Sequence, residues 1–111
     1  DALAQEGARA AIEDSDWLAR ASAEVASTRT MLSTELEQLG FVVSPSAANF
    51  LFVHHPNYGG QAIFDALRNH NILVRRWDKP RIADYLRITV GTADECARLI
   101  AVLRAVLAEW A

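Results

Sequence analysis

Hydrophobic residues recur at spacings of three and four along the first third of the chain, a pattern typical of one face of an amphipathic helix. We predict a long helix over residues 15–39, with this face formed by Trp17, Ala21, Val25, Thr28, Leu32, Leu36 and Leu39. The Asp-Ser-Asp stretch at 14–16 interrupts the helical pattern before it and offers capping side chains, so a new helix is expected to begin there. Gly40 predicts its end, because glycine readily takes the left-handed conformation that closes a helix, and Phe41 can then fold back onto Leu36.

The rest of the chain combines short strand patterns with two further helices. Short hydrophobic runs predict strands at residues 41–43, 49–53, 72–75 and 85–90. A helix is expected between the second and third strands, with its apolar face formed by Ile63, Phe64 and Leu67. Another should follow the last strand, where Thr92 and Glu95 match a capping box before Cys96, Leu99, Ile100, Leu103, Val106, Leu107 and Trp110. This order predicts an α+β fold in which a small mixed or antiparallel sheet is covered by helices.

The length of 111 residues, of which 51% are hydrophobic, matches one compact domain. We expect a single domain over residues 1–111, made of the long helix at about 15–39 and an α+β body at about 41–111. The chain starts at Asp1, without an initiator methionine and inside a helical pattern, so we expect it to be a piece of a longer protein.

The formal charge of −3 argues against a surface built for nucleic acid. The charge is unevenly distributed, however, because residues 68–87 carry +4 and the remainder carries −7. A local anion site fits this segregation better than a polyanion groove, and ordinary solvated surface charge is the alternative. The only cysteine, Cys96, excludes an internal disulfide and is expected in the core. The lack of a possible disulfide favours a cytoplasmic protein, and no membrane span or secretion signal is recognisable, so we expect a soluble one.

Arg87 is the first candidate for a binding residue, since alternation along its strand places it on one face with Tyr85 and Thr89. A guanidinium group binds a carboxylate or a phosphate through two parallel hydrogen bonds, each contributing about 1.5–3 kcal/mol. Arg75, at the end of the preceding predicted strand, can converge on the same anion. Spacing alone leaves a second interpretation open for both residues, namely that they are solvated surface arginines.

The other reactive side chains form no recognisable motif. His54 and His55 are interpreted as loop residues that point to opposite faces, and His70 as a cap at the end of a helix. None of them has a partner at a metal-ligand spacing, and no serine lies in a G-x-S-x-G sequence. Gly59 and Gly60 are expected to form only a turn before a helix. We therefore predict no metal site and no catalytic residue in this chain.

Three segments resemble, in their order and over most of the chain, the C-terminal region of histidinol-phosphate aminotransferases and related fold type I aminotransferases, which use pyridoxal 5′-phosphate (PLP). They are SPSAANFLFV at 44–53, NILVRRWDKPRIADY at 71–85 and YLRITVGT at 85–92. The resemblance implies that this chain is a C-terminal small domain. It also implies that Arg87 binds the anionic group of the substrate, the carboxylate of glutamate or the phosphate of histidinol phosphate.

The resemblance places Arg75 at a second arginine that contributes to the phosphate end, with Arg76 as the alternative because the loop varies in length. Asn49 matches a position for which we expect a structural role. PLP is held by a lysine as a Schiff base, and the chain's one lysine, Lys79, lies in a polar loop beside Pro80. The PLP-binding residues are therefore expected outside this chain, which alone should be inactive.

The implied reaction is amino transfer between L-histidinol phosphate and 2-oxoglutarate, in histidine biosynthesis, by a cytoplasmic homodimer. An aromatic amino-acid aminotransferase and a threonine-phosphate decarboxylase are alternatives, since both anchor an anion opposite PLP. A non-catalytic module that binds a small anion, or an interaction domain without a ligand, would belong to other functional classes.

Overall fold

The computed structural model describes residues 2–44 and 49–111, and side chains from residue 16 onward. Within these ranges the elements are α1 (Ala2–Gln38), β1 (Val42–Ser44), β2 (Phe50–His54), α2 (Gly60–Asn69), β3 (Leu86–Thr89) and α3 (Ala93–Trp110). The strands form a sheet in the order β1-β2-β3, and both pairings are antiparallel. The predicted α+β fold, with a small antiparallel sheet covered by helices, is confirmed.

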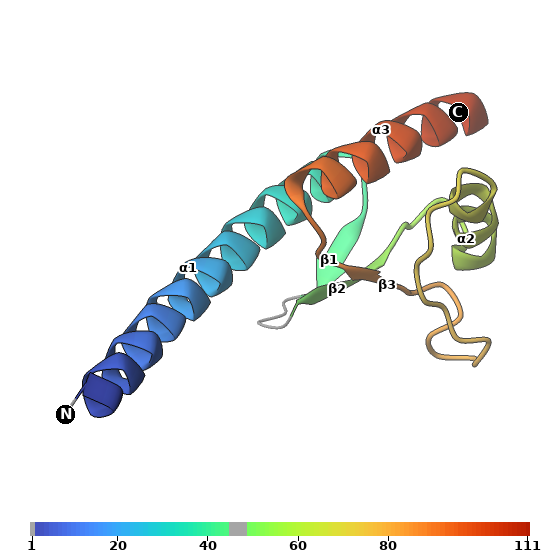
Figure 1. Ribbon diagram of the computed structural model, residues 1–111. Helices are drawn as coiled ribbons and strands as arrows, with labels where there is room; N and C mark the ends of the chain where they lie inside the picture. Colours follow the sequence, from blue (N-terminus) through green and yellow to red (C-terminus); the bar gives the residue numbers. More distant parts are fainter. Residues whose placement is uncertain (1, 45–48) are drawn as a thin grey trace.

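The helices α1 and α3 lie next to each other above one face of the sheet, and α2 lies beside α3 (Figure 1). The core fills the space between this helical layer and the sheet. It is formed by Leu32, Leu36, Phe41, Leu51, Val53, Ile63, Leu67, Leu86, Ile88, Val90, Cys96, Leu99, Ile100 and Leu103. The helical layer therefore covers one face of the sheet.

The predicted interruption at residues 14–16 is wrong, because α1 runs without a break from Ala2 to Gln38. Asp and Ser are only weakly unfavourable inside a helix, and neither Gly nor Pro follows them to stop it. Among the side chains of α1 from residue 16 onward, the hydrophobic face is fully buried toward the C-terminal end of the helix. Leu32 and Leu36 are fully buried there, whereas Trp17 is 63% exposed. Figure 1 shows that the N-terminal part of α1 extends past the sheet.

Both α1 and α2 end in a Schellman motif. At the end of α1, Gly40 has a φ of +95°, its amide donates to the Glu37 carbonyl, and the next amide donates to the Leu36 carbonyl. At the end of α2, Asn71 takes the left-handed conformation with a φ of 62°, and the same two bonds run back to Arg68 and Leu67. The first ending is confirmed as predicted, and the second uses asparagine, which tolerates this conformation better than most residues.

The predicted strand at 72–75 is not formed. Only its last residue, Arg75, pairs with β3, in an isolated bridge to Arg87. The Ile72 amide donates back to the Leu67 carbonyl at the end of α2, and residues of both segments, among them Leu73, Val74 and Ile88, line a hollow. Hydrophobic residues alone therefore did not decide whether this segment joins the sheet.

His54 is the last residue of β2, so its interpretation as a loop residue is wrong. His55 lies beyond the strand, in the turn that bridges to Tyr58, but its side chain is buried. Its side chain is 8% exposed and packs edge-on against Phe41, with 5.0 Å between ring centroids. The ring Nδ1 accepts from the Asn57 amide at 3.2 Å, so Nε2 carries the proton that it donates to the Leu39 carbonyl at 3.0 Å. His54 and His55 do point to opposite faces. The His55 ring packs against Phe41, whereas the His54 ring lies against Tyr85, with 4.7 Å between the ring centroids.

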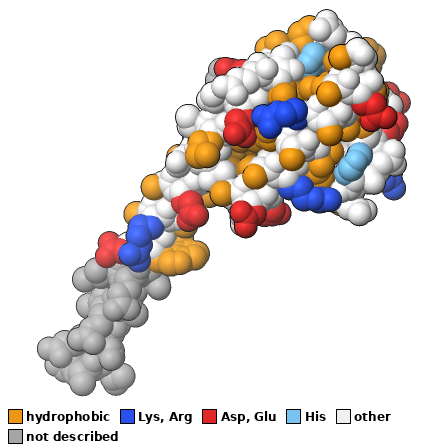
Figure 2. All heavy atoms as spheres, turned by 90° about the horizontal axis from the view of Figure 1, so that it is seen from above, with side chains coloured by type: hydrophobic (Ala, Val, Ile, Leu, Met, Phe, Trp, Pro, Cys, Tyr) orange, Lys and Arg blue, Asp and Glu red, His pale blue; other side chains and the backbone are white. Residues whose placement is uncertain are grey.

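The start of α3 matches the predicted capping box. The Thr92 hydroxyl accepts from the Glu95 amide at 3.2 Å, and the Glu95 carboxylate accepts from the Thr92 amide at 3.0 Å. The hydrogen bond from the Thr92 amide, and to a smaller extent the Thr92 side chain, holds the pKa of Glu95 below its ordinary value. On the helical side of the molecule, charged side chains are scattered singly rather than gathered in a basic patch (Figure 2). No helix in the described part of the chain is long and apolar enough to cross a membrane.

Candidate functional site

The sheet face that α1 and α3 do not cover carries the polar side of β3. Leu86 and Ile88 point into the core, while Arg87 between them is half-buried on the opposite face. The strand β2 alternates in the same way, because Leu51 and Val53 are buried and Phe50, Phe52 and His54 are only partly buried. The hydrophobic run at 49–53 predicted this strand without assigning its side chains to faces. The structure places both phenylalanines on the face that carries Arg87.

Arg75 and Arg87 form a cross-strand pair. Each donates its backbone amide to the carbonyl of the other, at 3.0 and 2.9 Å. Residues paired in this way in an antiparallel ladder project their side chains to the same face, with Cα atoms about 5.5 Å apart. Two like charges directly opposite each other are unfavourable unless an anion lies between them or solvent screens them. The backbone thus brings together the two arginines that the sequence singled out.

Arg87 also contacts aromatic rings. Its guanidinium carbon lies 5.3 Å from the centroid of the Phe50 ring and 5.7 Å from that of Trp77. The Nε atom is buried and has no hydrogen-bond partner among the described residues, and the same holds for Nδ1 of His54 on the same face. Buried nitrogens without partners are uncommon in folded proteins. Their occurrence together on one sheet face marks it as the candidate site.

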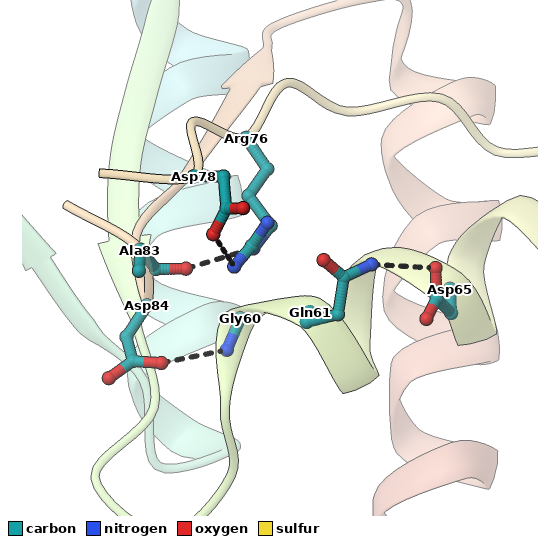
Figure 3. A network of polar contacts seen from close by, with 7 residues as sticks. All are labelled: Gly60, Gln61, Asp65, Arg76, Asp78, Ala83 and Asp84. Carbon is teal, nitrogen blue, oxygen red and sulfur yellow. Dashed lines mark hydrogen bonds and ion pairs between the residues drawn. The ribbon is translucent and has the colours of Figure 1, made fainter. Parts of the chain in front are cut away.

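Arg76 points into its own loop instead. Its Nε donates to the Ala83 carbonyl at 2.9 Å, and one terminal nitrogen lies 3.6 Å from Oδ1 of Asp78 (Figure 3). Its side chain is only 13% exposed, and the Arg75 side chain is exposed. Of the two neighbouring arginines, Arg75 is therefore the one whose side chain is available beside Arg87.

The loop that leads into β3 is anchored to the start of α2. The Gly60 amide, in the first turn of this helix, donates to Oδ1 of Asp84 at 3.3 Å (Figure 3). A carboxylate at this position also interacts favourably with the positive end of the helix dipole. A Cβ atom on Gly60 would lie 2.7 Å from the Ala83 carbonyl oxygen, so the close approach requires glycine. This contact ties Asp84, two residues before β3, to the start of α2.

The remaining candidates lie elsewhere. Lys79 is exposed in the loop. His70 caps α2, with Nδ1 2.9 Å from the Ala66 carbonyl, as predicted. Cys96 is a free thiol in the core, and burial raises its pKa. Among the described side chains, no cluster of three or more His, Cys, Asp or Glu could hold a metal ion.

The sequence reasoning missed the aromatic part of the site. Trp77 and Phe50 were not predicted to be site residues, although both contact Arg87. The signal for Phe50 was the alternation of β2, which places Phe50, Phe52 and His54 on one face. The sequence contained no comparable signal for Trp77, because a loop folds it back onto the sheet.

Comparison with known proteins tests the resemblance on which these residues were chosen. The family model for aminotransferase class I and II matches residues 1–103. The chain belongs to this aminotransferase family. Class I and II relatives named histidinol-phosphate aminotransferase 2 are 50% identical in Rhizobium meliloti and 53% identical in Gluconobacter oxydans, each over 94% of this chain.

A solved aminotransferase structure agrees with the fold. The histidinol-phosphate aminotransferase from Sinorhizobium meliloti, in complex with pyridoxal-5′-phosphate, is 28% identical and superposes with a TM-score of 0.79 over 92% of this chain. The chain spans about 30% of the length of the curated relatives, and 28% of that structure. The resemblance to the aminotransferase family is confirmed. The matches cover only one part of each relative's length.

Whether the described residues could hold PLP depends on whether one of them offers a suitable amine. The cofactor needs an amine in a desolvated pocket, and Lys79 is exposed in a polar loop. The sheet face that carries Arg75 and Arg87 offers cationic donors for an anion but no amine of this kind. The described residues therefore fit a substrate's anionic group and not the attachment of the cofactor.

Proposed function

We propose that this chain is the substrate-anchoring C-terminal part of a PLP-dependent aminotransferase that acts on L-histidinol phosphate and 2-oxoglutarate. The observation that carries the proposal is the backbone pair between Arg75 and Arg87, which directs two guanidinium groups to one sheet face. The names of the relatives at about 50% identity supply the substrate. We further propose a cytoplasmic homodimer in histidine biosynthesis.

In this proposal the chain orients the substrate relative to the cofactor. Arg87 is the principal ligand of the substrate's anionic group, and Arg75 beside it adds a second positive charge. An anion between them would also offset the repulsion between the two cations. PLP, bound by residues outside this chain, would supply the electron sink for amino transfer. Holding the far end of the substrate limits its rotation, which brings its reacting end to the cofactor in one geometry.

The choice of Arg75 over Arg76 rests on the loop contacts. Arg76 already donates to the Ala83 carbonyl and lies near Asp78, so using it for substrate would cost the loop these interactions. Arg75 is exposed and makes no comparable side-chain contact within the described residues. Replacement of Arg75 is therefore expected to weaken substrate binding, while replacement of Arg76 is expected to destabilise the loop.

Steady-state kinetics of the complete enzyme test the assignment. Arg87→Ala removes a bidentate charge-assisted contact, so kcat/KM for histidinol phosphate should fall by about two to four orders of magnitude. Arg87→Lys keeps the charge without the planar fork and should fall between the wild type and Arg87→Ala. The cofactor's absorbance should not change. Arg104→Ala, at an exposed arginine of α3, is the matched control and should behave as wild type.

Equal activity of Arg87→Ala and the wild type would refute the role of Arg87. A direct comparison of histidinol phosphate, phenylalanine and threonine phosphate as substrates tests the named reaction. A preference for phenylalanine, or carbon dioxide release from threonine phosphate, would replace the proposed substrate by one of the alternatives. Specific binding of a small anion by a protein without transaminase activity would favour the non-catalytic module.

A further inference from the structure

Three aromatic side chains form a cluster beside Arg87, and two of them contact its guanidinium group. Phe50 and Phe52 meet edge to face with 5.5 Å between their centroids, and Phe52 lies 6.0 Å from Trp77. We call Phe50, Phe52 and Trp77 the aromatic cluster. Arg87 contacts two of its rings, Phe50 from β2 and Trp77 from the loop before β3. Segments distant in sequence thus meet on the charged part of one side chain.

The aromatic cluster is the contact that orients this guanidinium group. In the described part of the chain, no carboxylate forms an ion pair with Arg87, and its buried Nε has no acceptor. A flexible arginine without polar partners would ordinarily sample several rotamers. Here the faces of two rings attract the cation and restrict its plane. The two terminal nitrogens are left as the donors that can meet a ligand.

This arrangement suits a binding residue that has to be ready before its ligand arrives. An ion pair within the protein would also orient the arginine, but its carboxylate would compete with an anionic substrate. Aromatic rings fix the side chain without competing for its hydrogen bonds. Fewer rotamers then have to be lost when the anion binds, so the affinity for the anion rises.

We propose that Trp77 is a positioning residue, which holds Arg87 in the orientation that binds the substrate's anionic group. The inference rests on the function proposed above. It goes beyond that function by assigning a role to a loop residue that has no charge and need not touch the substrate. Trp77 is half-buried, so it can be replaced with less effect on the fold than a core residue.

A double-mutant cycle in the complete, PLP-loaded enzyme tests this role. Trp77→Leu keeps an apolar side chain but removes the ring, so KM for histidinol phosphate should rise about 3- to 30-fold with little change in kcat. Trp77→Phe restores a ring and should recover most of the loss. In an Arg87→Ala background, Trp77→Leu should have no further effect on KM, because its target is already gone.

Trp110→Leu is the matched control. This tryptophan lies at the end of α3 and contacts Tyr58, with 5.3 Å between centroids, away from Arg87. Its replacement should leave KM unchanged. Thermal unfolding of each variant separates a folding defect from a positioning effect. If Trp77→Leu does not fold, the KM of Trp77→Phe is measured instead. A small increase in this KM that is absent in the Arg87→Ala background supports the proposal.

Two results would overturn the proposal while leaving the proposed function intact. One is an unchanged KM in Trp77→Leu, and the other is an increase of the same size in the presence and absence of Arg87. In both cases Arg87→Ala alone would still impair the enzyme. An unchanged KM in Arg87→Ala itself would instead overturn the proposed function and this inference together.

Discussion

Replacing Gly60 with alanine tests whether the packing of α2 against the loop before β3 sets the position of Arg87. An alanine Cβ at this position would lie 2.7 Å from the Ala83 carbonyl oxygen and 2.9 Å from Cα of Asp84. Both are backbone atoms, so neither can rotate away as the end of a side chain could. Overpacking of this kind costs about 1–3 kcal/mol, against at most about 1 kcal/mol gained by removing a glycine from a helix. We therefore expect a net loss of about 1–2 kcal/mol.

Gly59→Ala is the matched control, one residue away. The nearest atom to its Cβ would be Oδ1 of Asp84 at 3.6 Å, an ordinary contact, and its φ of −70° suits alanine. Alanine is a poorer helix cap than glycine, but it also lowers the entropy of the unfolded chain, and these two effects are of similar size and opposite sign. Gly59→Ala should therefore be close to neutral.

Hydrogen exchange in the proposed enzyme can localise the effect. The amides of Arg75 and Arg87 report the bridge beside the site, and their protection should fall about tenfold in Gly60→Ala and hardly at all in Gly59→Ala. The KM for histidinol phosphate should likewise rise in Gly60→Ala and hardly change in Gly59→Ala. Equal protection in both variants would refute the reasoning, because it would mean that the close contact between Gly60 and the loop does not hold β3 in place.

Three further substitutions test the parts of the fold that carry the sheet. Thr92→Ala should cost about 1 kcal/mol in urea unfolding at pH 7. The Thr92 amide, which is the larger cause of the lowered pKa of Glu95, keeps its bond to the carboxylate in this variant. Only the smaller share from the Thr92 side chain should be complete above the ordinary pKa and lost as pH falls through the lowered one, whereas the lost bond from the Glu95 amide to the Thr92 hydroxyl does not titrate; a cost that disappears completely in acid would contradict this. Gly40→Ala should cost about 1–2 kcal/mol for its left-handed backbone and also displace His55, whose Nε2 would lie 2.8 Å from the new Cβ; an unshifted His55 ring signal in NMR would argue against it. Leu36→Ala, at a fully buried position, should lower the free energy of unfolding by about 2–5 kcal/mol, and a loss well below this range would show that the core relaxes around the cavity.

Local sequence patterns predicted the elements whose stabilising contacts lie close together in the chain. The capping box at Thr92 and Glu95 and the Schellman ending at Gly40 involve residues only a few positions apart, and both are formed as expected. The alternation of β3 also predicted which of its side chains enter the core. In these cases the deciding interaction was local, so the residue types alone were sufficient.

Two of the failures concern contacts between distant segments. The strand expected at 72–75 required β3 as a neighbour along its length, but only Arg75 pairs with it. The burial of His55 was not predicted, because its partners, the Leu39 carbonyl and the Phe41 ring, belong to another part of the chain. The break expected within α1 failed for the opposite reason, since capping residues without a helix breaker do not stop a helix.

The candidate site divides in the same way. The alternation along residues 85–90 was enough to assign Arg87 to the polar face of its strand, and the resemblance of its segment to a known family indicated an anion as the ligand. The position of Arg75 beside it, the engagement of Arg76 in its own loop and the contacts of Phe50 and Trp77 with the guanidinium group became known only from the folded chain. Side-chain direction within one strand follows from the geometry of the backbone, whereas the neighbours of that side chain depend on how separate segments pack.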